Sequence, residues 1–152
     1  MYFDPTFEGT LNKYEKLGMM SALALQSPLH RDWLLSDIEL YLEPAIHSNQ
    51  CQFFFRHGGL VAFATWASVD QDTHEKIMQL DTPVPKDKWT SGTNTWLIDV
   101  VAPFGDAAPL VRHLQRNELA AVKRAYSVKR NLDGTRNRVK IWKNDFQKMF
   151  DV

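Results

Sequence analysis

The sequence predicts an α/β (α+β) fold, in which helices flank a mixed, largely antiparallel sheet. Segments with helical spacing of apolar residues alternate with β-rich runs along the chain. Two boundaries between β-rich runs, at 58–59 and 132–134, contain the glycine that tight hairpin turns prefer. With 152 residues, of which 44% are hydrophobic and 12% aromatic, the chain can bury one sizeable core. We therefore expect a single domain over 1–152.

The first part of the chain predicts two helices. Apolar residues at helical spacing indicate a helix over about 11–25 that ends before Pro28. Ser36 and Glu39 have the spacing of a capping box, which favours the start of a second helix at that point. Proline lacks an N–H group and clashes with the preceding turn, so Pro44 should kink this second helix or cut it short.

A hairpin is the clearest local signal in the middle of the chain. The β-rich runs 51–57 and 60–67 are separated by Gly58-Gly59, and glycine supplies the positive φ of a two-residue turn. A short helix over 70–80 and a loop over 83–92 should follow.

The last part of the chain predicts a helix and a second hairpin. Asp106 can cap a helix that accepts Pro109 in its first turn and continues at helical spacing to Glu118. The runs 123–130 and 135–142 then alternate as two strands around the second glycine turn.

Two ionisable residues occupy positions where a purely structural role is difficult to explain. His30 follows the turn at Pro28, which should expose its ring. Asp99 interrupts an otherwise apolar strand, where an unpaired carboxylate costs several kcal/mol. Taken alone, a loop histidine and a strand-end aspartate would be ordinary structural residues. Together they are candidates for an acid–base pair.

Charge is distributed unevenly along a chain whose formal net charge is zero. Residues 1–108 hold 7 Lys and Arg against 14 Asp and Glu, whereas residues 109–152 hold 11 against 4. The basic part is either a docking face for an acidic partner or a solvated hairpin that packs beside its own acidic half.

Cysteine and histidine usage restricts the compartment and the chemistry. Cys51 is the single cysteine, so an internal disulfide is excluded, and we expect a core thiol. No stretch has the length and apolar character of a membrane span or a cleavable signal sequence. The five histidines lack metal-ligand spacing. We expect a cytoplasmic protein without a metal site.

Several short motifs appear in a distinctive order between about 20 and 130. They are Ser27-Pro28-Leu29-His30-Arg31 with Trp33, Pro44-Ala45-Ile46 with Asn49-Gln50, Trp66-Ala67, Trp89-Thr90-Ser91-Gly92, and Ile98-Asp99 with Ala102-Pro103-Phe104-Gly105-Asp106. In this order and spacing the chain resembles the RTX toxin-activating lysine acyltransferases, a haemolysin-activating, acyl carrier protein-dependent family. These enzymes attach fatty acyl groups to internal lysines of pore-forming protoxins.

The resemblance implies a fold like that of the GCN5-related N-acetyltransferases and a homodimer. It also implies an acyl-acyl carrier protein donor, an RTX-type protoxin as acceptor, and no bound cofactor. His30 and Asp99 would be the catalytic pair, with Ser27 as a supporting residue. The chain lacks a glycine-rich loop for the pyrophosphate of coenzyme A. This absence favours the carrier-protein donor.

Acyl transfer to lysine needs a proton acceptor, because a lysine amine is mostly protonated at neutral pH. His30 could act as general base or could take the acyl group itself as an acyl-imidazole. Asp99 could orient His30, or it could bind the incoming lysine and help to deprotonate it. The sequence leaves these routes open.

Basic residues in or beside the second hairpin are candidates for docking an acidic carrier protein. They are Lys123, Arg124, Lys129, Arg130, Arg136, Arg138 and Lys140. The family pattern commonly has a second arginine where Ser127 stands in Arg124-Ala125-Tyr126-Ser127. Any role of that arginine is therefore in doubt for this chain.

Two other classes of function are alternatives. One is a coenzyme A-dependent small-molecule N-acetyltransferase, which tight coenzyme A binding would reveal. The other is a non-catalytic module whose basic hairpin binds an acidic partner, either protein or nucleic acid. The acyltransferase interpretation requires no nucleic acid and no membrane span.

Overall fold

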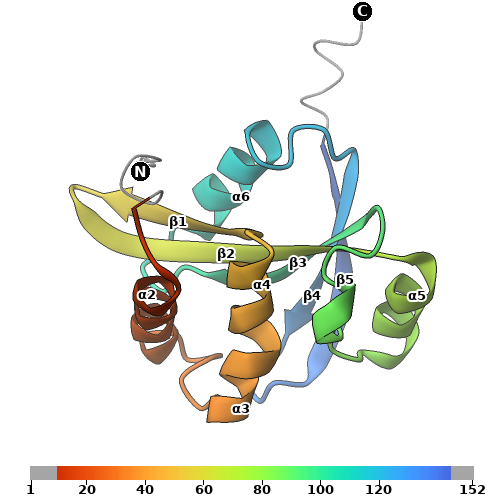
Figure 1. The fold of residues 1–152 in the computed structure, drawn as a ribbon, viewed down its shortest axis with the longest axis horizontal. Helices are drawn as coiled ribbons and strands as arrows, with labels where there is room; N and C mark the ends of the chain where they lie inside the picture. The colour runs from red at the N-terminus through yellow and green to blue at the C-terminus, as the bar shows by residue number, and fades with distance from the viewer. Residues whose placement is uncertain (1–9, 145–152) are drawn as a thin grey trace, which may run out of the picture.

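The computed structural model describes residues 10–144 and contains the expected mixed sheet flanked by helices (Figure 1). Five strands are hydrogen-bonded in the order β1-β2-β3-β4-β5. Every neighbouring pair is antiparallel except β3 and β4, which are parallel. The prediction of a largely antiparallel sheet is confirmed, and the architecture is consistent with a GCN5-related N-acetyltransferase-like fold. The strands are β1 (Cys51–Arg56), β2 (Gly59–Val69), β3 (Asn94–Val101), β4 (Arg124–Arg130) and β5 (Arg136–Lys143).

Helices cover both faces of this sheet. The helical segments are α2 (Lys13–Leu25), α3 (Leu35–Asp37), the π-helical turn η1 (Ile38–Leu42), α4 (Glu43–His47), α5 (Gln71–Leu80), the 3₁₀ turn η2 (Lys86–Lys88) and α6 (Ala107–Arg116). Buried side chains of α2, η1, α4 and α5 join one apolar cluster, and those of α6 join a second cluster. The sheet therefore separates α6 from the other helices.

The first predicted helix is confirmed as α2. The side chain of Asn12 accepts from the N–H of Glu15 at 2.9 Å, and the Glu15 carboxylate accepts from the N–H of Asn12 at 3.2 Å. This reciprocal capping box satisfies two N–H groups that the first turn leaves without helical partners. The helix ends at Leu25, before Pro28.

The second helical segment begins differently from the prediction, and the proposed Ser36–Glu39 capping box is wrong. The N–H of Leu34 donates to the Asp37 carboxylate at 2.7 Å, so the N-cap is Leu34 and the helix begins two residues earlier than predicted. Glu39 instead forms an ion pair with Lys86 on η2.

Pro44 does not end the helical segment, because the preceding turn widens. The N–H of Glu43 donates to the carbonyl of Ile38, five residues earlier, in a π-helical turn. In a regular α-helix the ring of Pro44 would clash with the carbonyl of Leu40. The π turn accommodates the proline, and α4 follows it directly.

The first hairpin is confirmed, with its turn one residue earlier than predicted. Arg56 pairs with Gly59, which leaves His57 and Gly58 as the two turn residues, with φ of 51° and 77°. Two successive positive φ angles match the right-handed twist of the strands. His57 thus adopts the left-handed conformation that the sequence assigned to a glycine.

The loop before β3 is fastened to the end of β2. The N–H of Ser68 donates to the carbonyl of Trp89 at 2.9 Å, and the N–H of Gly92 donates to the carbonyl of Ser68 at 3.1 Å. A Cβ atom on Gly92 would lie 2.5 Å from the carbonyl oxygen of Val69. Only glycine fits this approach, which holds the buried indole of Trp89 against the core.

The helix predicted after Asp106 is α6, which ends at Arg116 and so excludes Glu118. Asp106 precedes the helix, but its side chain makes no capping hydrogen bond and pairs with Arg56 of β1. The predicted capping role of this carboxylate is therefore wrong. The ion pair ties the start of α6 to the first hairpin.

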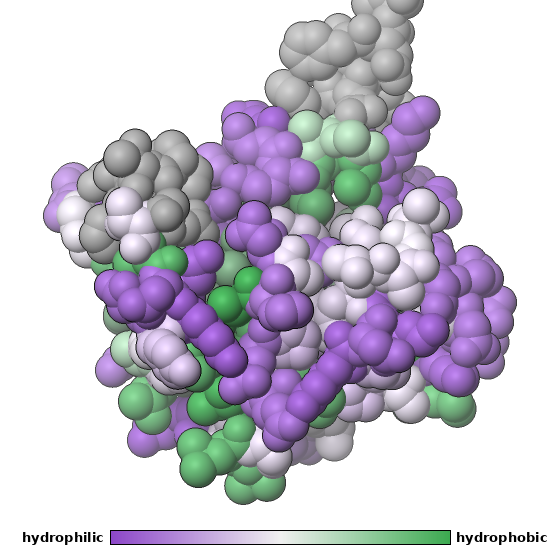
Figure 2. Space-filling model, viewed as in Figure 1, coloured by the Kyte–Doolittle hydropathy of each residue, from purple (hydrophilic) through white to green (hydrophobic). Residues whose placement is uncertain are grey.

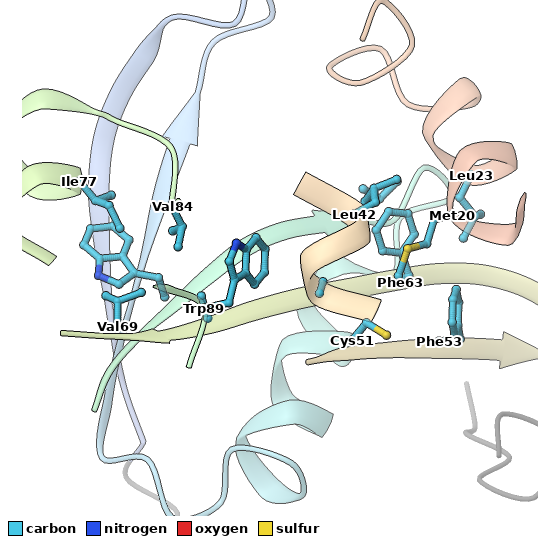
Figure 3. Packing of buried hydrophobic residues seen from close by; sticks show 14 of the residues in the cluster. Met20, Leu23, Leu42, Cys51, Phe53, Phe63, Val69, Ile77, Val84 and Trp89 are labelled. Carbon is cyan, nitrogen blue, oxygen red and sulfur yellow. The ribbon is translucent and has the colours of Figure 1, made fainter. Parts of the chain in front are cut away.

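Large aromatic side chains form much of the core on the face of α2, α4 and α5 (Figure 3). Phe53 and Phe63 pack near Met20 of α2, and Trp89 lies between this group and the residues near α5. Cys51 is buried in the same cluster, so the expected core thiol is confirmed. Within residues 10–144, no helix combines the length and the apolar character that crossing a membrane requires.

The face seen in Figure 2 is mostly hydrophilic, with hydrophobic side chains at its lower edge. Figure 1 places the end of α2 and the start of α3 at this edge. The exposed leucines of these segments are Leu25, Leu34 and Leu35.

Candidate active site

A cavity opens where the two parallel strands separate. β3 and β4 pair at only three positions, from Thr95 opposite Ala125 to Leu97 opposite Ser127. Beyond Leu97 the strands make no further pairs, and a cavity of about 970 Å³ lies there. Its walls come from both strands, the turn after α2, the α3–η1 segment, the end of α5, the first turn of α6 and the second hairpin.

Asp99 reaches the cavity from β3 beside a β-bulge. Thr65 pairs with Asp99 while the next residue of β2, Trp66, pairs with Leu97, so Ile98 is the extra residue. The N–H of Asp99 donates to the hydroxyl of Thr65 at 3.2 Å. Bulges re-aim side chains, and this one lies at the point where the parallel pairing with β4 ends.

His30 lies on the opposite wall in the turn that follows α2. The N–H groups of His30 and Arg31 both donate to the carbonyl of Ser27, at 3.0 and 2.9 Å. The expectation that this turn exposes the His30 ring is wrong, because only 6% of the residue is exposed. The turn directs the ring toward the sheet, where it makes a T-shaped contact with Trp33, with ring centroids 4.9 Å apart.

The two ionisable residues meet across 69 positions of sequence. Nε2 of His30 lies 3.0 Å from Oδ1 of Asp99, and Nδ1 of His30 lies 2.6 Å from Oγ of Ser27. Since Nε2 faces a carboxylate oxygen, we assign a hydrogen to Nε2, and Nδ1 then accepts the hydroxyl hydrogen of Ser27. Oδ2 of Asp99 is buried without a hydrogen-bond partner among the described residues.

This arrangement resembles the acid–base part of a catalytic triad. An imidazole is held in one orientation by a carboxylate and a hydroxyl, beside a cavity that can admit a substrate. Ser27 itself does not line the cavity, whereas His30 and Asp99 do. Ser27 therefore contacts the His30 ring from the side that does not face the cavity.

The predicted docking residues lie on the two faces of the β4–β5 hairpin. Lys129, Arg138 and Lys140 share the face toward α6 and line the cavity. Lys123 and Arg124 are exposed at the start of β4.

Arg130 and Arg136 instead engage α5. Arg130 donates to both carboxylate oxygens of Asp81 at 2.8 and 2.9 Å. Arg136 donates to the carbonyls of Ile77 and Met78 at 3.0 and 2.7 Å. These two guanidinium groups hold the end of α5, so they are less available to an external partner than the other five candidates.

Sequence reasoning missed Tyr41, which lines the cavity from the π turn. Its ring stacks on Trp33 with centroids 5.4 Å apart. Burial, and then the charge of Asp99, raises the pKa of the Tyr41 hydroxyl above its ordinary value. The available signal was Pro44, since a proline inside a helical pattern distorts the turn before it.

No group of three or more His, Cys, Asp or Glu side chains within residues 10–144 is arranged to hold a metal ion.

Most aromatic residues of β1 and β2 are buried in the apolar clusters, and Trp96 of β3 also reaches the cavity wall.

Comparison with known proteins gives a consistent result. Residues 9–143 match the RTX toxin acyltransferase family (HlyC). The chain is 40% identical over 107 residues to the RTX-I toxin-activating lysine-acyltransferase ApxIC of Actinobacillus pleuropneumoniae. The aligned residues cover 70% of this chain and 62% of that protein. It is 35% identical over 106 residues to the leukotoxin-activating lysine-acyltransferase LtxC of Aggregatibacter actinomycetemcomitans, covering 70% and 63%.

A similar match links the chain to the protein-lysine myristoyltransferase HlyC of Escherichia coli, with 36% identity over 102 residues, covering 67% of this chain and 59% of that protein. The matched region thus spans less than two thirds of the length of each of these three relatives.

Proposed function

The chain belongs to the RTX toxin acyltransferase family, and from this we propose that it transfers a fatty acyl group from an acyl-acyl carrier protein to internal lysines of an RTX-type protoxin, and so activates the protoxin. The names of its relatives support lysine acylation, since they include a toxin-activating lysine-acyltransferase and a protein-lysine myristoyltransferase. One observation carries the proposal: the buried His30–Asp99 pair faces a cavity of about 970 Å³.

The pair would remove a proton from the acceptor lysine. The lysine arrives as an ammonium ion, and its nitrogen becomes nucleophilic only after a proton leaves. The nitrogen gives one proton to the His30–Asp99 pair before it forms a bond to the thioester carbonyl carbon, and it loses a second proton to solvent as the amide forms. The C–S bond breaks, its electron pair leaves on the carrier thiolate, and the thiolate takes the proton that the pair held. A hydroxyl both donates and accepts, so Ser27 supports the ring in either protonation state.

We infer direct transfer rather than an acyl-imidazole intermediate. Both ring nitrogens of His30 are occupied, one by Ser27 and the other by Asp99. An acyl group on Nε2 would need the position that Oδ1 of Asp99 already holds, and Asp99 is part of a paired strand. Nε2 and Oδ1 can share a proton at 3.0 Å, but the space between them is too small for a carbonyl carbon.

The donor is proposed to approach from the side of α6. Lys129, Arg138 and Lys140 line that part of the cavity, and they would face an acidic carrier. Complementary charge mainly raises the encounter rate and selects the partner.

Intact-mass measurement of an RTX protoxin tests the proposal. Incubation with this enzyme and fatty-acylated carrier protein should add one or more acyl groups, and peptide fragmentation should locate them on lysines. His30→Ala and Asp99→Asn should each lower the rate at least about a hundredfold. His47→Ala, at an exposed histidine of α4, is the matched control and should remain active. No mass gain with the wild-type chain, or equal gain with His30→Ala, would overturn the proposal.

The same assay tests the donor. Acyl-coenzyme A supplied at the concentration of the acylated carrier should give little product. Equal rates with both donors would reject the carrier-protein part of the proposal and favour the coenzyme A-dependent alternative.

We also propose a homodimer in the cytoplasm. The family resemblance supports the dimer, and a lone buried thiol, Cys51, accords with a reducing compartment. Light scattering coupled to size-exclusion chromatography should give twice the chain mass. A monomer mass at micromolar concentration would contradict the dimer.

A further inference from the structure

The cavity has two walls of opposite charge. Four carboxylates line the side formed by the α2–α3 turn, α3, β3 and the end of α5, namely Asp32, Asp37, Asp99 and Asp81, and a fifth, Asp133, lies at the turn of the second hairpin. The cation on that side, Arg130, is held by Asp81 in a two-point ion pair. Lys129, Arg138 and Lys140 line the other side, next to α6. In the view of Figure 1, β4 and β5 appear between the α3–α4 segment and α5.

Aromatic rings extend along the acidic wall from the His30–Asp99 pair. Trp33 and His30 make a T-shaped contact, and the ring planes are inclined by 81°. Tyr41 then stacks on Trp33 with the planes inclined by 21°. All three side chains line the cavity, so the rings form a continuous surface beside Asp99.

The backbone at Tyr41 adopts a turn that proteins use sparingly. The π turn accommodates Pro44, and it includes Tyr41 next to the cavity. Such turns often occur at functional sites. Tyr41 is half-buried, and a tyrosine hydroxyl is neutral at physiological pH, so the ring adds no charge to this wall.

A carboxylate oxygen beside stacked aromatic rings suits an alkylammonium group. Oδ2 of Asp99 is buried without a partner among residues 10–144, which is costly for a charged oxygen unless a ligand pairs with it. Ring faces attract cations and also pack against methylene groups. A lysine side chain supplies both, with four methylenes that end in an ammonium.

We propose that the stacked rings of Trp33 and Tyr41 form the wall along which the acceptor lysine enters, with its ammonium directed to Oδ2 of Asp99. This inference rests on the proposed acyltransferase function and adds an acceptor-binding residue, Tyr41, to it. The charge of the walls assigns the direction: the cationic acceptor enters on the carboxylate side, and the acidic carrier approaches the side of Lys129 and Lys140.

Variants of Tyr41 separate acceptor binding from donor binding. Tyr41→Leu removes the stacked ring and should raise the KM for a lysine-containing protoxin peptide about three- to fivefold. The KM for acylated carrier protein and kcat should remain within about twofold of wild type. Tyr41→Phe keeps the ring and should behave as wild type. Tyr14→Leu, at an exposed tyrosine of α2 that does not line the cavity, is the matched control.

Two modified peptides test the same wall in the wild-type chain, so this test does not depend on whether a variant folds. A peptide with trimethyl-lysine in place of the acceptor keeps the cation but cannot be acylated, so it should inhibit competitively against the acceptor peptide. A norleucine peptide lacks the charge and should inhibit at least about threefold more weakly. If Tyr41→Leu does not fold, Tyr41→Gln provides a second non-aromatic variant.

The outcomes distinguish this inference from the proposed function. If the wild-type chain acylates no protoxin, the proposed function fails. If the wild type is active but Tyr41→Leu leaves the acceptor KM unchanged, or raises the carrier KM instead, only the acceptor-wall inference is overturned. Equal inhibition by the two modified peptides would also overturn it.

Discussion

At the scale of single residues, the central feature is an imidazole held at both nitrogens. Ser27 lies three positions before His30 and contacts Nδ1 at 2.6 Å, whereas Asp99 contacts Nε2 at 3.0 Å from strand β3. A ring fixed in this way is oriented before substrate arrives, and such preorganisation avoids a cost during the reaction. Ser27 is therefore a positioning residue in the proposed mechanism.

Replacing Ser27 separates the hydroxyl from the bulk of the side chain. We expect Ser27→Ala to lower kcat about five- to tenfold, because one hydrogen bond of about 1 kcal/mol to the imidazole is lost. The KM for the acceptor should change little, since Ser27 does not line the cavity. Ser27→Thr retains the hydroxyl and should recover part of the rate. Equal loss of rate in both variants would indicate a packing role instead.

Direct transfer predicts that no acylated enzyme accumulates. When acylated carrier protein is mixed with this enzyme without an acceptor, intact-mass spectra at millisecond to minute times should show only the unmodified chain. The reason is that Asp99 and Ser27 occupy both ring nitrogens of His30. An adduct that forms in the wild type, disappears in His30→Ala, and is consumed when the acceptor is added would establish the acyl-imidazole route.

At the scale of elements, the second hairpin holds the end of α5. Asp81 follows α5 in the left-handed conformation and receives two hydrogen bonds from Arg130 of β4. Arg136 of β5 donates to the carbonyls of Ile77 and Met78 in the last turn of α5. The hydrogen bonds from Arg130 lower the pKa of the Asp81 carboxyl.

The Asp81–Arg130 pair predicts a pH-dependent difference in stability. Asparagine tolerates the left-handed conformation, so Asp81→Asn removes the charge with little backbone effect. At neutral pH the variant should unfold more easily by about 1 kcal/mol, a small value because both side chains are partly exposed.

The sign of this pH dependence follows from the lowered pKa of Asp81. The folded-state pKa lies below the unfolded value, so the stabilisation is present above the unfolded pKa and is lost as pH falls through the folded one. Denaturant unfolding of both chains from neutral pH into the acid range should therefore converge. A constant difference at all pH values would mean that the pair contributes through packing rather than charge.

At the scale of the whole molecule, charge is distributed unevenly both along the chain and around the cavity. Along the chain, residues 109–152 carry 11 Lys and Arg against 4 Asp and Glu. Around the cavity, the hairpin face of Lys129, Arg138 and Lys140 lies opposite the carboxylate wall. The uneven distribution of charge along the sequence thus gives a cavity with one basic and one acidic wall. Such a cavity suits two partners of opposite charge.

This separation predicts salt-sensitive docking of the donor. The double variant Lys129→Glu and Arg138→Glu should raise the KM for acylated carrier protein about tenfold with a smaller effect on kcat, because exposed charges steer encounter. Lys13→Glu on α2, outside this cavity, is the control. Added salt should weaken wild-type docking more than docking of the double variant, since exposed charges are screened over about 8 Å at physiological ionic strength. A KM that is flat across the variants and a salt titration would leave the basic face as a solvated surface.

Local patterns in the sequence were sufficient to predict the helices and strands. The helix before Pro28, the hairpin near Gly58, the helix after Asp70 and the strand of Asp99 all lie where apolar spacing and turn residues predicted them. These features depend on neighbours within a few residues, whose steric and hydrogen-bonding preferences are encoded locally. The family motifs also named His30 and Asp99 before their distance was known.

The contacts between residues that are distant in sequence depend on tertiary packing. It buried His30 against Asp99 across 69 residues, assigned Arg130 and Arg136 to α5, and brought Tyr41 to the cavity wall. The capping box at Ser36 failed for a local reason instead, because the Asp37 carboxylate accepts from the N–H of Leu34 and sets an earlier start. Burial and long-range pairing depend on how separate elements pack on one sheet, and local spacing does not specify those contacts.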